Sequence, residues 1–524
     1  EGHETVERHV GDAVEQTPRT PPPRDGGTEP DPAEQLVHLE VETASTQRHP
    51  GERPRLRRKI RCDGPRPCSR LPGIVRRPDG QNRTHAAQVI PWVESPAAAR
   101  HIHRWKEMFV KIAVIALGKI GLPLAVQFAD MGHEVVGVDV QQTVVDKVNA
   151  GTEPFPGEAH LQEKLSVLVP AGKLRATCDY SEAIPGVDAI VIVVPLFVND
   201  ETWQPDFGWM EAATRSFAEH LTPGTLISYE TTLPVGTTRN RWKPMIEEIS
   251  GLEEGKDFHL VFSPERVLTG RVFEDLRKYP KLVGGLSPEG TAKGIDFYEQ
   301  VLTFDERPDL PQGNGVWDMG SAEAAEMAKL AETTYRDVNI GLANQFGKFA
   351  AAHGIDVHKV IDASNSQPYS HIHRPGIAVG GHCIPVYPRL YLYTDPEATI
   401  VRTAREANMT MPGYAIGLAE GVLGDLKGRR VVVLGASYRG RVKETAFSGV
   451  FPTVEILKSK GVEVLVHDPM YTDEELAAFG FTPYRLGEPV DAAILQADHP
   501  EYLDLTPTDL PGTQVIIDGR GVLD

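Results

Sequence analysis

Residues 111–139 read KIAVIALGKIGLPLAVQFADMGHEVVGVD and decide the fold of this chain. The pattern predicts a strand over Lys111–Leu117, then a glycine-rich turn, a helix over Leu122–Met131 and a second strand over Val135–Asp139. A strand, a helix and a parallel strand in this order form the βαβ unit of dinucleotide-binding domains. The stretch therefore predicts a doubly wound α/β domain.

The turn and the acid after the second strand are candidate cofactor contacts. Asp139 follows Gly121 by 18 residues, close to the spacing of an acid that binds an adenosine ribose, which favours NAD over NADP. Ala116 stands where this fingerprint has its first glycine, and the alternative is an ordinary turn whose glycines serve packing. The predicted turn contacts are Gly118, Lys119, Ile120 and Gly121.

Further buried strands are predicted over Ala189–Val194, Thr225–Tyr229 and His259–Phe262. Ligands of doubly wound sheets bind where such strands end. The second of these strands runs into ETTLPVGTT, which contains Thr232, and the third into SPERV, which contains Glu265. Glu265 is either a surface charge or a general base at the cleft.

A long helix is predicted over Ser321–Ala352, with Ser321 as its N-cap and Gly354 as its stop. Its apolar spacing indicates a buried spine between two domains. Lys329 and Thr333 share one face. A lysine on an exposed helix is usually solvated, whereas one that faces a cleft is a candidate cation for an oxyanion.

Gly380-Gly381-His382-Cys383-Ile384-Pro385 holds a thiol on a glycine-backed turn. Glycines let the backbone approach a ligand closely, and a thiolate is a strong nucleophile near neutral pH. The alternative is a small buried hydrophobic residue beside a tight loop. Cys62 and Cys68 have no partners at zinc spacing, and no metal site is predicted.

The C-terminal part repeats the first plan: a strand over Arg430–Leu434, a helix over Phe451–Lys460 and a strand over Val462–His467. We therefore predict two Rossmann-like doubly wound domains joined by a long central α-helix. A cleft between them would hold two nucleotides, one of them part of the substrate.

The first hundred residues differ, since they are rich in Pro, Arg and Gly and lack a regular period. We expect a disordered extension, or an artefact of start-site assignment, because the first methionine is Met108. The rival is a genuine tail with a basic patch over Arg53–Arg61. The predicted domains are 1–107, this extension; 108–310, the NAD-binding Rossmann domain; 311–425, the central helical region with the cysteine; and 426–524, the second Rossmann-like domain.

The chain has 524 residues with 54 Lys and Arg against 73 Asp and Glu, a net charge of −19. This balance argues against nucleic acid and anionic membranes as main partners. Only four cysteines and no secretory apolar stretch favour the cytoplasm.

From Val110 to the C-terminus, these motifs resemble the UDP-glucose/GDP-mannose dehydrogenase family of nucleotide-sugar 6-dehydrogenases. The form HCIP resembles the UDP-N-acetylmannosamine and UDP-N-acetylglucosamine dehydrogenase branch. The resemblance implies Cys383 as nucleophile, Lys329 as oxyanion stabiliser, Glu265 as base and Thr232 as the residue that orients water and contacts the cofactor. The implied substrate contacts are Glu265, Arg266, Lys329, Thr333, Gly380, Gly381 and Arg439.

The family oxidises a sugar C6 alcohol to a carboxylate with two NAD, through a cysteine thiohemiacetal and thioester. The resemblance also implies a homodimer or higher oligomer, with dimerisation through 311–425, and a nucleotide-sugar substrate, bound by 426–524. The alternatives are a catalytically impaired nucleotide-binding paralogue and a dehydrogenase that performs one oxidation.

This chain departs from the family pattern at four positions. Tyr387 stands where the family has a catalytic Asp, Thr333 where it has Asn, Ala446 where it has Arg, and Tyr369 where relatives with an HPR sequence have Arg. Because a tyrosine with its ordinary pKa of about 10 is a poor base, we expect slower turnover or a higher pH optimum.

Overall fold

The computed structural model of the protein describes residues 110–523. Met108, the Cys62 and Cys68 pair and the predicted extension 1–107 lie outside these described residues. No helix within the described range is long and apolar enough to cross a membrane.

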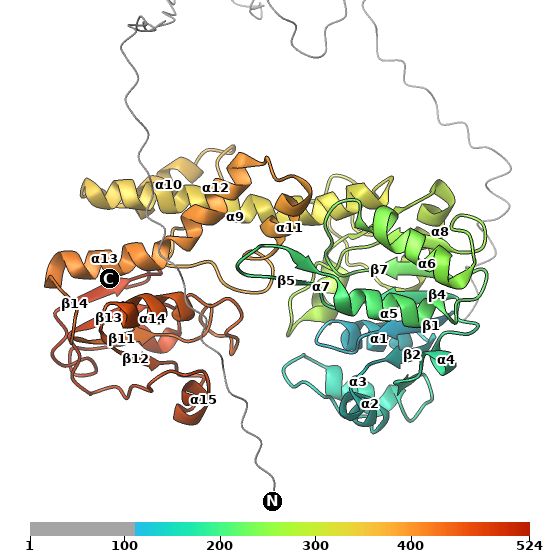
Figure 1. Ribbon diagram of the computed structural model, residues 1–524, viewed down its shortest axis with the longest axis horizontal. Helices are drawn as coiled ribbons and strands as arrows, with labels where there is room; N and C mark the ends of the chain where they lie inside the picture. The colour runs from blue at the N-terminus through green and yellow to red at the C-terminus, as the bar shows by residue number, and fades with distance from the viewer. Residues whose placement is uncertain (1–109, 524) are drawn as a thin grey trace, which may run out of the picture. The chain divides into compact units, whose positions relative to one another are not determined.

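The larger sheet has eight strands in the order β10-β9-β8-β7-β4-β1-β2-β3 (Figure 1). Its strands are parallel except that β9 runs antiparallel to β8. The strands are β1 (Lys111–Ile115), β2 (Glu134–Val138), β3 (Leu174–Thr177), β4 (Ala189–Ile192), β7 (Leu226–Tyr229), β8 (His259–Phe262), β9 (Lys281–Gly285) and β10 (Val316–Asp318). A separate antiparallel hairpin joins β5 (Phe197–Val198) and β6 (Pro205–Asp206).

Helices cover both faces of this sheet, which is why its strands are apolar along their whole length. In β1, Ile112 and Val114 enter one hydrophobic cluster, whereas Ala113 and Ile115 enter the other. One cluster is completed by α1 (Gly121–Asp130), α2 (Gln142–Asn149), α3 (Leu161–Leu168), α7 (Val272–Lys278) and α8 (Pro288–Val301), the other by α4 (Tyr180–Ala183), α5 (Gly208–Ala218) and α6 (Lys243–Ser250).

Helix α9 (Ala322–Ala352) is the predicted long helix, drawn in yellow in Figure 1. The Ser321 side chain accepts a hydrogen bond from the Ala324 amide and caps it, and Gly354 follows with φ +65°. Asp337 of α9 and Arg405 form a buried ion pair of 3.1 Å. Around α9 lie α10 (Val357–Asn365), α11 (Tyr387–Thr394) and α12 (Thr399–Met409).

After α13 (Met411–Leu423), the chain forms a second, four-stranded parallel sheet in the order β12-β11-β13-β14. Its elements are β11 (Arg430–Leu434), α14 (Val450–Ser459), β12 (Glu463–His467), α15 (Asp473–Ala478), β13 (Ala492–Leu495) and β14 (Val515–Asp518). The predicted fold class, two Rossmann-like domains joined by a long helix, is confirmed.

The predicted bounds hold for β8, β11 and α9. Strand β1 is shorter than predicted: it ends at Ile115 because Ala116 has φ +75° and cannot continue the strand. The prediction of Ala189–Val194 was also two residues too long, since β4 ends at Ile192.

Candidate active site

The cysteine loop is shaped by close packing against the second sheet's domain. A Cβ atom on Gly380 would lie 2.6 Å from the Tyr438 Cβ, and one on Gly381 would lie 3.2 Å from the Tyr438 ring. Gly381 also has φ +90°, and its amide donates to the Ala446 carbonyl at 2.8 Å. Both glycines are therefore required for this loop to lie under Tyr438.

Cys383 has a free, partly exposed thiol where this loop enters α11. Its carbonyl accepts hydrogen bonds from the Val386 amide at 3.2 Å and the Tyr387 amide at 2.9 Å. These bonds fix the backbone on which the thiol is carried. The neighbouring His382 points elsewhere, since its Nε2 lies 3.5 Å from the Glu444 carboxylate.

Lys329 of α9 lies close enough to Cys383 to interact with it electrostatically. Its side chain is buried, its Nζ lies 4.0 Å from Glu332 Oε1, and it stands 5.7 Å from the centre of the Tyr387 ring. Burial lowers the pKa of Lys329, while the nearby charges of Glu332, Cys383 and Glu265 oppose that shift. A cation thus faces the thiol in a poorly solvated place, as stabilisation of an oxyanion requires.

Tyr387 closes the same site. Its hydroxyl lies within hydrogen-bonding reach of the Thr232 hydroxyl and the Cys383 thiol. The surroundings that bury this hydroxyl raise the pKa of Tyr387 well above 10, and the charge of Cys383 adds to the effect. Tyr387 is therefore a neutral phenol near pH 7 that offers a hydrogen bond rather than a base.

Thr232 lies in the loop after β7, and α9 holds this loop. The buried Glu326 carboxylate accepts hydrogen bonds from the Gly236 amide at 2.5 Å, the Thr238 amide at 2.9 Å and the Thr238 hydroxyl at 2.6 Å. Burial raises the pKa of Glu326 to about 7, although the hydrogen bonds from Thr238 and Gly236 act to lower it. Glu326 was not predicted from the sequence.

Glu265 follows β8 and joins a buried charge cluster. Its Oε2 lies 2.9 Å from Lys281 Nζ, and its Oε1 accepts from the Arg266 amide at 2.6 Å. The Arg266 guanidinium pairs with Glu332 at 2.8 Å, so Arg266 is linked to the glutamate beside Lys329. Lys281 also binds Glu230, at 2.6 Å.

Thr333 differs from the other predicted contacts. It is fully buried, and its hydroxyl reaches the Lys329 and Leu330 carbonyls at 3.0 and 3.1 Å. The one hydroxyl proton of Thr333 is thus donated within α9, so Thr333 can donate a hydrogen bond to a substrate only if it gives up these bonds. Its role as a substrate contact stays a prediction.

The cofactor turn fits a dinucleotide. A Cβ atom on Gly121 would lie 1.9 Å from the Ala116 carbonyl oxygen, so glycine is required there, whereas the space beside Gly118 is open. At the end of β2, the Asp139 carboxylate accepts from the Leu117 and Gln141 amides, both at 2.9 Å. Backbone that can be approached closely and an acid at the ribose spacing are what NAD requires.

Of the remaining turn residues, Lys119 faces the second sheet's domain, whereas Ile120 packs against a hydrophobic cluster of the larger sheet. The exposed Lys119 pairs with Glu444 at 3.2 Å, and Ile120 precedes α1 without capping it through a side chain. Arg439 is exposed, with its guanidinium 5.7 Å from the Tyr438 ring centre. Glu444 thus contacts both the cofactor turn and His382 of the cysteine loop, a link between segments about 300 residues apart in the sequence.

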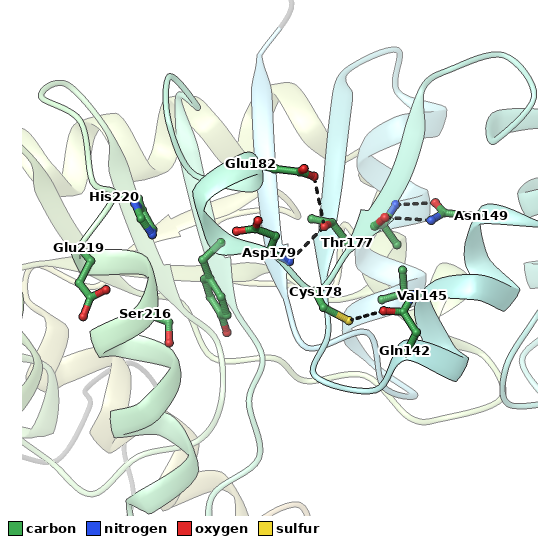
Figure 2. Close-up of a pocket in the computed structure, with 12 residues that line it drawn as sticks. Gln142, Val145, Asn149, Thr177, Cys178, Asp179, Glu182, Ser216, Glu219 and His220 are labelled. Atoms are coloured by element: carbon green, nitrogen blue, oxygen red, sulfur yellow. Dashed lines mark hydrogen bonds between the residues drawn. The ribbon is translucent and has the colours of Figure 1, made fainter.

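A separate open hollow of about 640 Å³ lies beyond β3 and contains none of the predicted site residues. Figure 2 shows Cys178 there, with its thiol directed to Gln142 at 3.4 Å. Burial raises the pKa of Cys178, and the charges of Asp139 and Asp146 add to it. The raised pKa makes this thiol a weaker nucleophile near neutral pH than an ordinary cysteine.

Sequence reasoning missed Glu230, Lys281, Glu326 and Glu444 as parts of the site. Glu230 was visible as the first residue of the ETTLPVGTT loop, and Lys281 as a lysine at the start of an apolar run. Nothing local signals that Glu326 faces a loop 88 residues earlier.

Comparisons with known proteins agree with this geometry. Models of the UDP-glucose/GDP-mannose dehydrogenase family match the chain over residues 110–302 (NAD binding domain), 323–410 (central domain) and 432–524 (UDP binding domain). A UDP-N-acetyl-D-mannosamine dehydrogenase of Pyrococcus horikoshii is 34% identical over 79% of this chain and 96% of its own length.

An NDP-N-acetyl-D-galactosaminuronic acid dehydrogenase of Ralstonia nicotianae is 32% identical, over 79% of this chain and 96% of its own length. A solved UDP-D-ManNAc dehydrogenase structure from Pyrococcus horikoshii has a TM-score of 0.69 and 32% identity, with the same coverage of the two chains.

Proposed function

The chain belongs to the UDP-glucose/GDP-mannose dehydrogenase family, a family of NAD-dependent oxidoreductases, and we propose that it oxidises a nucleotide sugar at C6 to the uronic acid. The proposed reaction removes four electrons and passes through a covalent bond to Cys383. The observation that carries this proposal is the meeting of the Cys383 thiol, the buried Lys329 ammonium and the Tyr387–Thr232 hydroxyls in one place.

In the first oxidation, the sugar alcohol loses a hydride, gives its hydroxyl proton to solvent water and becomes an aldehyde. Bound NAD supplies the hydride acceptor for this and for the second oxidation. Gly118 to Gly121 and Asp139 hold the dinucleotide. Lys329 stabilises the negative charge that develops on the C6 oxygen.

Cys383 then captures the aldehyde. Its thiolate sulfur bonds to the carbonyl carbon, and the oxygen becomes a thiohemiacetal oxyanion beside Lys329. Loss of a second hydride gives a thioester. The Tyr387 hydroxyl hydrogen-bonds the Cys383 sulfur and the Thr232 hydroxyl. It therefore holds the nucleophile close to the hydroxyl that positions water.

Hydrolysis completes the reaction. Glu265 removes a proton from a water molecule that Thr232 orients, and the water oxygen attacks the thioester carbonyl. The C–S bond breaks and Cys383 leaves as a thiolate. Glu265, Arg266 and Arg439, together with the backbone of Gly380 and Gly381, are the proposed sugar and nucleotide contacts.

The substrate we propose is a UDP-N-acetylhexosamine, with a UDP-hexose as the second candidate. Support comes from the match to the UDP binding domain and from relatives whose names specify N-acetylmannosamine or N-acetylgalactosaminuronic acid. The domain bounds 108–310, 311–425 and 426–524 are likewise proposed, and each encloses one of the three family matches.

We also propose a homodimer or a higher homo-oligomer built on α9. Tyr335, Leu342, Phe346 and Phe349 are exposed at 54%, 47%, 38% and 59% and recur at helical spacing. An exposed apolar stripe of this kind usually marks a protein interface. The free Cys383 thiol fits a reducing compartment such as the cytoplasm.

A panel of nucleotide sugars tests the proposal. UDP-GlcNAc, UDP-ManNAc, UDP-glucose and UDP-galactose are each incubated with the full chain and NAD, and the absorbance of NADH is followed. We expect turnover of an N-acetylhexosamine substrate and a uronic acid product by mass spectrometry. Absence of NADH formation with every sugar would support the impaired paralogue instead.

A further inference from the structure

Three ionisable side chains meet in a nearly dry cluster beside the active site. Lys281 Nζ lies 2.6 Å from Glu230 Oε2 and 2.9 Å from Glu265 Oε2. The exposed fractions of the side chains are 4% for Lys281, 0% for Glu230 and 12% for Glu265. One ammonium therefore serves two carboxylates where water cannot screen them.

Neighbouring strands bring the three groups together. Glu230 follows β7 and Glu265 follows β8, and the Glu265 amide donates to the Glu230 carbonyl at 3.1 Å. Lys281 begins β9, and because β9 runs antiparallel to β8 its first residue lies at the end of β8. The cluster thus lies directly beyond the ends of β7 and β8, beside the first residue of β9.

The two carboxylates have different surroundings. The Tyr298 hydroxyl donates to Glu230 Oε1 at 2.6 Å and contacts Ser228 at 2.7 Å, so Glu230 is enclosed on its far side as well. Glu265 stands at the rim, where Lys329 and the Arg266–Glu332 pair face it from α9 and from its own loop.

This difference decides which carboxyl group holds a proton. Burial raises the pKa of Glu230 to about 7, in spite of the Lys281 charge. Burial also acts to raise the pKa of Glu265, but the charge and hydrogen bond of Lys281 outweigh it, and the pKa lies below its ordinary value. Near neutrality, Glu230 takes up the proton of the pair and Glu265 keeps its charge.

We propose that Glu230 and Lys281 are positioning residues that hold Glu265 as an oriented carboxylate for hydrolysis of the Cys383 thioester. The inference rests on the proposed function. Glu265 takes the proton of the attacking water, the new C–O bond forms, and the C–S bond breaks to release the Cys383 thiolate. Lys281 contacts both carboxyl groups, so its ammonium keeps a hydrogen-bond partner in Glu230 while Glu265 is protonated.

Both partners lower the pKa of Glu265, which gives the test its signature: Lys281 acts through its charge and a hydrogen bond, and Glu230 acts through a hydrogen bond. Removal of the Lys281 charge raises the pKa of Glu265, so the acidic limb of the hydrolysis rate moves to higher pH. Removal of the Glu230 hydrogen bond moves the same limb in the same direction by less, whereas a neutral side chain that keeps this bond leaves the limb in place, because Glu230 is itself protonated at the pH of that limb. The other charged or titratable groups that face the pair are Tyr298 from α8, Lys329 and Glu332 from α9, and Arg266.

The experiment compares Lys281→Met, Lys281→Arg, Glu230→Leu and Glu230→Gln with wild type by rapid-mixing kinetics and intact mass. In Lys281→Met we expect a burst of two NADH per site, then hydrolysis at least tenfold slower at pH 7, with a uronyl adduct on the protein. Lys281→Arg restores hydrolysis to within about threefold. Glu230→Leu, which removes the hydrogen bond, should shift the acidic limb upward by less than Lys281→Met, and Glu230→Gln, which imitates protonated Glu230, should leave it in place.

Lys278→Met and Glu274→Gln are matched controls, because these residues form an exposed ion pair on α7; both should behave as wild type. Unmoved acidic limbs in Lys281→Met and Glu230→Leu, with no adduct, would overturn the inference. Wild type that fails to form two NADH per sugar would instead overturn the proposed function, so the two failures are distinguishable.

Discussion

Ala116 occupies a backbone conformation that suits glycine. Its φ is +75°, in the first turn of the cofactor-binding unit, and its amide still donates to the Val138 carbonyl at 2.8 Å. A Cβ atom in the left-handed region costs about 1–2 kcal/mol. The cofactor turn is thus formed in spite of a strained residue at the position where the sequence fingerprint is imperfect.

We predict that Ala116→Gly raises the free energy of unfolding by about 1 kcal/mol, because relief of this strain exceeds the added entropy of the unfolded chain. Urea unfolding measures the change. Ala150→Gly is the control: Ala150 is exposed with φ −82°, so glycine there gives no gain. Equal effects of the two substitutions would contradict the account.

Tyr387 gives a second prediction at this scale. The pKa of its hydroxyl is raised above 10, so it supplies no base between pH 6 and 9. Tyr387→Asp places a carboxylate beside Cys383 and Lys329, and we expect a higher kcat or a pH optimum shifted downward. Tyr387→Phe removes one hydrogen bond, worth about 1 kcal/mol, and should lower kcat about fivefold. Unchanged kcat and pH profile in Tyr387→Asp would rule out a role for the missing Asp.

At the scale of elements, α9 does more than join two domains. It carries Lys329 toward the thiol and Glu326 toward the loop that contains Thr232. Apolar spacing and the Ser321 cap predicted the helix correctly, because both signals are local. The partner of Glu326 could not be predicted, since its contact with Thr238 depends on how the helix docks onto the sheet.

Glu326 also makes stability depend on pH. Its folded pKa is raised to about 7 from the usual 4.5, so its contribution is fully present below pH 4.5 and is lost as pH rises through 7. Between pH 5.5 and pH 8 the unfolding free energy of wild type should therefore fall by about 2 kcal/mol more than that of Glu326→Gln. Urea unfolding at the two pH values measures it; parallel profiles for both proteins would contradict the raised pKa.

For the whole molecule, the repeated βαβ pattern was enough to predict two Rossmann-like domains, since each unit is encoded over about 30 residues. The contacts that unite the parts are of another kind. Glu444 binds Lys119 across 325 residues, and Tyr438 packs on Gly380 and Gly381. Such contacts depend on how the folded domains pack together, and no residue spacing in the sequence predicts them.

The apolar stripe of α9 gives a prediction about assembly. Leu342→Glu combined with Phe346→Glu places two charges on this stripe and should convert a dimer to a monomer. Light scattering after gel filtration measures the mass. Val167→Glu, at an exposed apolar position on α3, is the control and should leave the mass unchanged. A double variant that keeps the wild-type mass would exclude this face as the interface.

The central claim is that Cys383 captures the aldehyde between two oxidations. It is tested most directly by counting NADH formed per nucleotide sugar consumed, in wild type and in Cys383→Ser. We predict two NADH per sugar for wild type and loss of this complete oxidation in the variant. One NADH per sugar in wild type, or two in Cys383→Ser, would contradict the covalent mechanism.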